Sequence, residues 1–170
     1  IMNLSLIEAG DIRLSRTVTH LDEVVEEVLT SFRERSVHRG RGLRMDLKSP
    51  PFAVHADPNR VREIVSHLVD NALRFSSDDT EIVVLLEPQA QSHMRVSVVD
   101  QGIGIADSAR EIIFESFQQA DTSHTRSFNG LGLGLTLASG LVSLHHSELE
   151  FISEEGGGST FFFELPACPN

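Results

Sequence analysis

Apolar side chains recur at helical spacing in two long segments of this chain. In residues 22–38 they fall at intervals of three and four, which predicts one buried helical face, and Gly40 supplies a stop. The segment from Pro58 to Phe75 repeats this spacing, and Asp57 precedes it as an N-cap. Further helices are predicted over residues 108–114 and 133–145, and residues 1–9 are expected to end another.

Strand-like runs of apolar residues alternate with these helices. They are predicted over residues 43–47, 52–56, 81–86, 94–99, 148–153 and 160–165. Adjacent strands are joined tightly at two places, which favours antiparallel pairing over a doubly wound sheet. The expected fold class is α+β: a two-layer α/β sandwich in which three or so helices cover a mixed, mostly antiparallel sheet of about five strands.

Composition limits the partners that this chain can have. Its 170 residues suit one domain, and a net charge of −11 argues against nucleic acid as a partner. A single cysteine, Cys168, excludes an intrachain disulfide framework and fits a cytoplasmic setting. No apolar run reaches the length of a membrane span. Because the chain begins at Ile1, before Met2, it is expected to be a piece of a longer protein whose membrane attachment stays open.

Three glycine clusters are the strongest candidates for chemistry. They lie at residues 100–104, 129–135 and 156–160. The first cluster follows a predicted strand, and the second precedes a predicted helix. Exposed backbone N–H groups in such places suit a polyphosphate. Ordinary turns, a hairpin and tight helix packing are the competing explanations. The polar, aperiodic residues 116–129 before the second cluster are typical of a mobile segment that closes over a ligand.

Polar residues of the 58–75 helix form a second candidate site. Glu63, His67, Asn71 and Arg74 share one stripe, and the simplest interpretation is a solvated face. Asn71 favours a site instead, since asparagine is a weak helix former and its amide oxygen can bind Mg²⁺. Arg74, one turn on, is placed to reach a phosphate. Two histidines that end the 133–145 helix, at 145 and 146, are read as a cation pair at a helix C-terminus.

Taken in order, these motifs resemble those of sensor histidine kinases. Residues 57–76 resemble the N box, 100–104 the G1 box, 113–117 the F box, 130–135 the G2 box and 156–161 the last glycine box. The resemblance implies the ATP-binding fold of the GHKL superfamily. It divides the chain into the end of a dimerisation helix with a connector at 1–17, an ATP-binding catalytic domain at 18–166 and a tail at 167–170.

The resemblance also implies a role for individual residues. Asn71 would coordinate Mg²⁺, and Asp100 would contact the adenine amino group. The glycines would shape the adenine pocket and border the phosphates, and Thr160 would supply the hydroxyl of the last box. Arg74, His67 and Arg126 are the catalytic candidates near the phosphates. The glycines concerned are Gly102 and Gly104 at the base, and Gly130, Gly132 and Gly134 at the phosphates.

The implied reaction transfers the γ-phosphoryl group of ATP to a histidine on a dimerisation domain outside this chain. None of the eight histidines has the sequence context of such an acceptor, so the chain as cut is not expected to phosphorylate itself. The implied partners are that dimerisation domain, a response regulator or receiver domain as in hybrid kinases, and another histidine kinase. The parent would be a homodimer with a cytoplasmic kinase domain, anchored or not in the inner membrane.

Three positions depart from the family pattern. His67 replaces an asparagine of the N box, and Asn129 and Leu131 replace a glycine and a threonine of the G2 box. These departures carry the alternative hypothesis: a degenerate module of the same fold, with weak or no ATP binding, that regulates a partner kinase by protein contact. A hydrolase of the same superfamily, or a serine kinase that acts on a partner protein, is less favoured, and the N box lacks the glutamate expected of the hydrolases.

Overall fold

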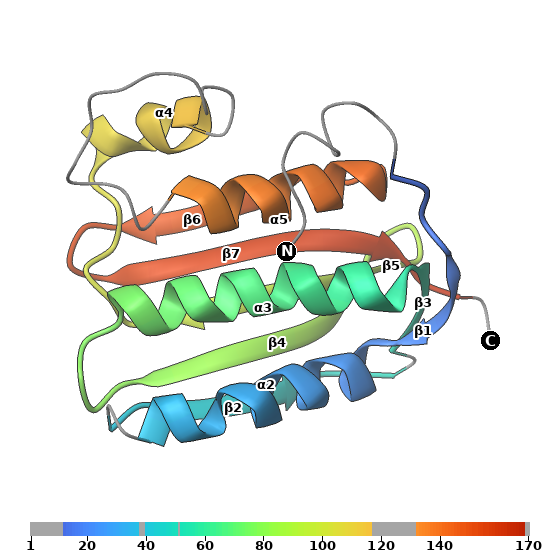
Figure 1. Ribbon diagram of the computed structural model, residues 1–170, viewed down its shortest axis with the longest axis horizontal. Coiled ribbons are helices and arrows are strands. Elements are labelled where there is room, and N and C mark those ends of the chain that lie inside the picture. Colours follow the sequence, from blue (N-terminus) through green and yellow to red (C-terminus); the bar gives the residue numbers. More distant parts are fainter. Residues whose placement is uncertain (1–11, 38–39, 51, 117–131, 169–170) are drawn as a thin grey trace.

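The computed structural model describes residues 12–37, 40–50, 52–116 and 132–168, and its main sheet has five strands in the order β2-β4-β5-β7-β6. The parallel pair is β2 with β4, and every other pair of neighbours is antiparallel. A mixed, mostly antiparallel sheet is therefore confirmed (Figure 1). The strands are β2 (Gly42–Leu47), β4 (Glu81–Gln89), β5 (His93–Asp100), β6 (Glu150–Glu154) and β7 (Gly158–Pro166).

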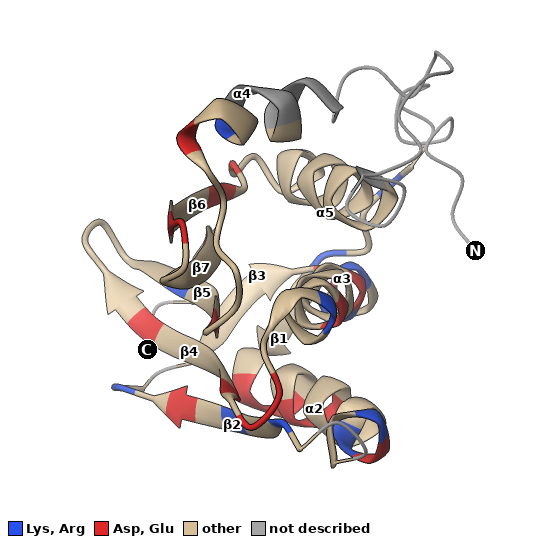
Figure 2. Cartoon of the chain, turned by 90° about the vertical axis from the view of Figure 1, so that its left-hand side faces the viewer, with Lys and Arg blue, Asp and Glu red and all other residues tan. Residues whose placement is uncertain are grey.

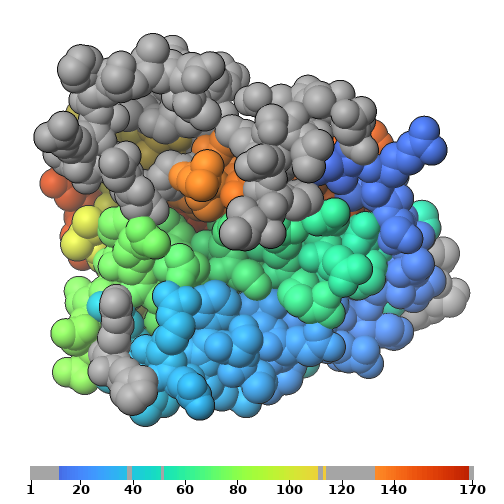
Figure 3. Space-filling model, in the orientation of Figure 1, coloured from blue at the N-terminus to red at the C-terminus, as the bar shows by residue number. Residues whose placement is uncertain are grey.

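Three helices lie side by side over one face of this sheet. Figures 1 and 2 show α2, α3 and α5 together on that face, with α4 beyond the start of α5. Ion pairs between Arg62 and Glu27 at 2.6 Å and between Arg35 and Asp70 at 2.7 Å cross from α3 to α2, which abut in the surface view (Figure 3). The two-layer sandwich is confirmed, with helices α2 (Leu21–Val37), α3 (Pro58–Phe75), α4 (Asp107–Ser116) and α5 (Gly132–Leu144).

The core lies between the two layers and follows the predicted periodicities. In α3 the apolar stripe from Val61 to Leu73 is buried, and alternate residues of each central strand face it. Full burial of one such side chain contributes roughly 1.5–3 kcal/mol. The strand residues that meet the helices include Ile82, Val84, Leu86, Met94, Val96, Val98, Phe161, Phe163 and Leu165.

A second, two-stranded sheet was not predicted as such. Strand β1 (Thr17–His20) pairs antiparallel with β3 (Ala53–Ala56), whereas the sequence pattern assigns no strand to residues 17–20. Four residues are too few to show a period of two, so tertiary pairing decides this element. The described part of the expected tail is also hydrogen-bonded, since the Cys168 amide donates to the Ala53 carbonyl at 2.8 Å.

His145 joins the end of α5 to the start of α3. Its Nδ1 donates to the Leu141 carbonyl at 2.8 Å, and its Nε2 accepts from the Asp57 amide at 3.2 Å. Burial lowers the pKa of His145, and nearby Arg16 acts in the same direction, while the Leu141 carbonyl and Asp57 oppose it. The interpretation of His145 as a helix-end cation is therefore wrong. Arg16 supplies the charge there, because its guanidinium donates to the Leu144 carbonyl at 2.9 Å.

We expect the stability of the domain to fall in mild acid because of this junction. A buried neutral histidine with a lowered pKa contributes stability above its unfolded pKa of about 6.5, and that stability is lost as the pH falls toward the folded pKa. Urea denaturation between pH 8 and pH 5 measures the effect. His145→Gln should flatten part of the pH dependence, whereas the exposed His146→Gln should not. Parallel curves for the two variants would contradict the assignment.

Candidate functional site

Three segments meet beside the C-terminal end of α3. The loop after β5 is tied to α3 because the Ile103 amide donates to the Phe75 carbonyl at 3.3 Å. The same loop is tied to the turn between β6 and β7, since the Gly156 amide donates to the Ile103 carbonyl at 2.8 Å. The residues of the first and third glycine clusters, far apart in the sequence, therefore lie together in the fold.

Asp100 lies at the centre of this junction, at the end of β5. Its side chain is buried, and Oδ1 accepts hydrogen bonds from the amides of Gly102 at 2.8 Å and Ser159 at 3.3 Å. Burial raises the pKa of Asp100, and these two backbone bonds oppose that effect by stabilising the charged form. Both bonds use the same oxygen, so Oδ2 takes no part in them. The arrangement fixes a carboxylate that can accept from a ligand amine.

Serine hydroxyls complete this junction, and sequence reasoning missed them. The Oγ atoms of Ser153 and Ser159 lie 2.9 Å apart, and the Ile105 amide donates to Ser153 Oγ at 2.8 Å. Asp100 and Ser159 are register partners and share the helix-covered face. Thr160 pairs with Val99 and so lies on the opposite face. The structure therefore brings Ser159, and not Thr160, to the face of the sheet on which Asp100 lies.

The glycines of this junction allow close backbone approach. A Cβ at Gly102 would lie 2.3 Å from the Phe75 carbonyl oxygen. At Gly104 the φ angle is +65°, and a Cβ would lie 1.9 Å from the Glu154 carbonyl oxygen. Gly158, with φ +86°, would place a Cβ 2.1 Å from the Asp100 carbonyl oxygen. These positions require glycine for the protein's own packing, and they shape the loop that adjoins Asp100.

The polar stripe of α3 faces the start of α5. The His67 ring packs against Gly134, where a Cβ would lie 3.5 Å from Nδ1. Burial lowers the pKa of His67, although Glu63 and Asp70 act in the opposite direction. His67 Nε2 is buried and has no hydrogen-bond partner among the described residues. Asn71, half-buried, follows one turn later on the same side of α3.

These residues fit a nucleotide-bound cation. A neutral imidazole nitrogen without a partner and an amide oxygen one turn away are both suitable metal ligands. Gly132 and Gly134 occupy the first turn of α5, whose leading N–H groups have no intrahelical acceptor. Helix α5 contains no Lys, Arg, Asp or Glu, and its ribbon is accordingly tan in Figure 2, so the attraction of its start for an anion comes from the backbone.

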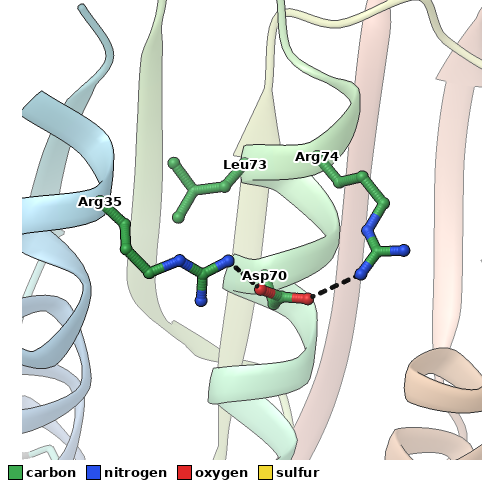
Figure 4. Close-up of a pocket in the computed structure, with 4 residues that line it drawn as sticks. All are labelled: Arg35, Asp70, Leu73 and Arg74. Carbon is green, nitrogen blue, oxygen red and sulfur yellow. Dashed lines mark hydrogen bonds and ion pairs between the residues drawn. The ribbon is translucent and has the colours of Figure 1, made fainter. Parts of the chain in front are cut away.

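Arg74 is already paired in this structure. Its guanidinium lies 3.5 Å from Asp70, and Arg35 of α2 lies 2.7 Å from the same carboxylate. Figure 4 shows the two arginines converging on Asp70 from opposite sides, around a pocket of about 280 Å³. A phosphate contact by Arg74 would require it to turn away from Asp70. The predicted residues Arg126 and Gly130, like Asn129 and Leu131, lie outside the described residues.

The fold and the site define a nucleotide-binding domain built as a two-layer sandwich. The family model described as "Histidine kinase-, DNA gyrase B-, and HSP90-like ATPase" matches residues 56–169. The chain therefore belongs to this ATPase family. Within the described residues, no helix is both long and apolar enough to cross a membrane.

The curated relatives that this chain resembles include histidine kinases. Signal transduction histidine-protein kinase BarA of Escherichia coli is 34% identical over 97% of this chain and 18% of its own length. Sensor protein GacS of Pseudomonas syringae is 32% identical over 97% of this chain and 19% of its own length. Circadian input-output histidine kinase CikA of Synechococcus elongatus is 34% identical over 98% of this chain and 22% of its own length. The chain thus spans about a fifth of the length of these relatives.

Solved structures agree with this placement. Full-length ShkA in complex with AMPPNP has a TM-score of 0.84 and 27% identity, and the match covers 98% of this chain and 34% of ShkA. The nucleotide-free catalytic domain of histidine kinase ThkA has a TM-score of 0.75 and 25% identity, and the match covers 90% of this chain and 96% of the ThkA chain. The chain is accordingly an ATP-binding domain of this family that is similar, along nearly its whole length, to the catalytic domains of histidine kinases, and nothing in the comparisons supports the degenerate alternative.

Substitution of the glycines should separate crowding from backbone strain. Gly104 and Gly156 both have positive φ, at +65° and +77°, but only Gly104 has a neighbour that a Cβ would strike. Gly156→Ala should lower the free energy of unfolding by about 1–2 kcal/mol through strain alone. Gly104→Ala should cost about 1–3 kcal/mol more. Urea denaturation of both variants measures the difference, and equal losses would contradict the role given to close approach.

Proposed function

We propose that this domain binds ATP with Mg²⁺ beside α3 and supplies the γ-phosphoryl group to a histidine on a separate dimerisation domain. The observation that carries the proposal is the buried Asp100 carboxylate, fixed by two backbone N–H groups next to the α3 stripe. One end of this site is built to recognise a base, and the other to hold a polyanion.

At the base end, we propose that Asp100 accepts a hydrogen bond from the exocyclic amine of adenine. Its Oδ1 is held by the amides of Gly102 and Ser159, so the carboxylate cannot rotate freely. Guanine presents a carbonyl oxygen where adenine carries its amine, and that oxygen would repel the carboxylate. A buried acceptor left without its donor costs about 1–3 kcal/mol, which favours ATP over GTP.

At the phosphate end, the start of α5 and the α3 stripe provide the proposed contacts. The free N–H groups near Gly132 and Gly134 would donate to phosphate oxygens. Asn71 would ligate Mg²⁺, which when bound neutralises developing charge on the transferred phosphoryl group. Arg74 would contact a phosphate after leaving Asp70, and Arg126 is the second proposed cation. Phosphoryl transfer depends mainly on such positioning and charge neutralisation.

The partners follow from the proposed reaction and from the relatives. The acceptor histidine would lie on a dimerisation domain of the same polypeptide, with residues 1–17 as the proposed connection to it. One relative is named a sensor protein, and another is named a hybrid signal transduction histidine kinase. A receiver domain or response regulator is therefore the proposed next phosphoryl acceptor, in a homodimeric parent whose kinase domain is cytoplasmic.

Titration of AMPPNP with Mg²⁺ tests the base contact. We expect saturable binding by calorimetry, and Asp100→Asn should weaken AMPPNP by about tenfold or more while reducing the preference for adenine over guanine nucleotides. Asp79→Asn is the matched control, because Asp79 is exposed and its positive φ of 60° tolerates asparagine. Absence of saturable binding by the wild-type chain would overturn the proposed function.

The role of Arg74 is tested by comparing two arginines that share one carboxylate. Arg74→Ala should weaken AMPPNP by about fivefold while changing ADP little, since the lost contact is with a terminal phosphate. Arg35→Ala removes the other ion pair of Asp70 and should leave both affinities unchanged. If the two variants behave alike, Arg74 acts only through the α2–α3 contact and its proposed phosphate role is wrong.

A further inference from the structure

His67 has one ring nitrogen that lacks a hydrogen-bond partner among the described residues. Its Nε2 is buried without a hydrogen-bond partner among the described residues, whereas both ring nitrogens of His145 are bonded. A buried polar atom left in this way costs about 1–3 kcal/mol, and native structures hold few of them. The position therefore calls for a partner that arrives with a ligand.

The protonation state of His67 selects the kind of partner. Burial favours the neutral ring, and the start of α5 at Gly134 adds the positive end of a helix dipole. Glu63 and Asp70 act in the opposite direction, and Arg74 on the same stripe is a further nearby charge. A neutral imidazole carries one lone pair, which can accept a hydrogen bond or bind a metal ion.

Position on the helix favours the metal. His67 and Asn71 are four residues apart on α3, so their side chains are neighbours on one face. Two ligand side chains at this spacing can hold one metal ion from a single helix, as in the HExxH motif. Here the pair would offer one nitrogen and one oxygen, and the start of α5 lies against the same face.

We propose that His67 is a nitrogen ligand of the nucleotide-bound divalent cation and shifts the preference of the site from Mg²⁺ toward first-row transition metals. The proposal rests on the proposed function, because the cation is the one that enters with ATP. Mg²⁺ takes oxygen ligands in near-ideal octahedral geometry, whereas imidazole suits Co²⁺, Ni²⁺ and Zn²⁺. One nitrogen among the ligands would weaken the site for Mg²⁺ relative to those ions.

Pulsed electron paramagnetic resonance tests the ligand directly. Mn²⁺ would replace Mg²⁺ in a complex of the wild-type chain with AMPPNP, prepared with ¹⁴N-histidine and with ¹⁵N-histidine. We expect a nitrogen coupling that changes with the isotope in the wild-type chain and in His146→Asn, and no such coupling in His67→Asn. His146 is a matched control, since it is exposed and its φ of 61° tolerates asparagine.

Affinity provides a second, independent measurement. The ratio of the AMPPNP dissociation constants with Mg²⁺ and Co²⁺ should fall about tenfold in His67→Asn relative to the wild-type chain and to His146→Asn. Thermal melts establish that each variant is folded. The electron paramagnetic resonance spectrum of the wild-type chain tests the ligand even if a variant does not fold. Nucleotide binding without a histidine coupling, or with an unchanged ratio, would overturn the proposal. Failure of the wild-type chain to bind nucleotide with any cation would instead overturn the proposed function.

Discussion

Close backbone approach around Asp100 is the constraint on which the site depends. The end of α3, the loop after β5 and the β6–β7 turn can be hydrogen-bonded to one another only where Cβ atoms are missing, as at Gly102 and Gly104. The same approach brings two amides to one oxygen of Asp100 and so holds a carboxylate in a buried position that would otherwise disfavour its charge. Packing and chemistry therefore depend on the same glycines.

Helix α3 connects this junction to the rest of the fold. One face supplies the central stripe of the core, and the other carries the polar residues that we assign to the cation and phosphates. Each end is fixed separately: the N-cap at Asp57 is bonded to His145 of the α5 end, and Phe75 is bonded to the loop after β5. Because α5 lies against α3 at both its start and its end, a shift of α5 would act on the stripe and on the cap of α3 together.

The sequence predicted those parts of the structure that local periodicity or order along the chain determines. The buried stripe of α3, its N-cap at Asp57 and the sheet class were confirmed, because spacing and turn chemistry specify them locally. The β1–β3 pair, the position of Ser159 beside Asp100 and the neutral state of His145 were not predicted, since they depend on register and on burial between distant segments. The pairing of Arg74 with Asp70 is of the same kind: an i, i+4 ion pair was open to prediction, but the third partner, Arg35, comes from α2.

Because the chain carries a net negative charge, the groups that attract an anionic ligand must lie close to it. A chain with a net charge of −11 repels a polyphosphate at long range, so attraction must come from groups within a few ångströms of the ligand. Helix α5 has no charged side chain, and the nearest described arginine of the α3 stripe, Arg74, is held by Asp70. Among the described residues, the remaining sources are the backbone N–H groups that begin α5, together with a cation carried by the nucleotide itself. Such a site would respond to the identity of that cation more than a site rich in arginine would, and this is the basis of the influence on binding that we propose for His67.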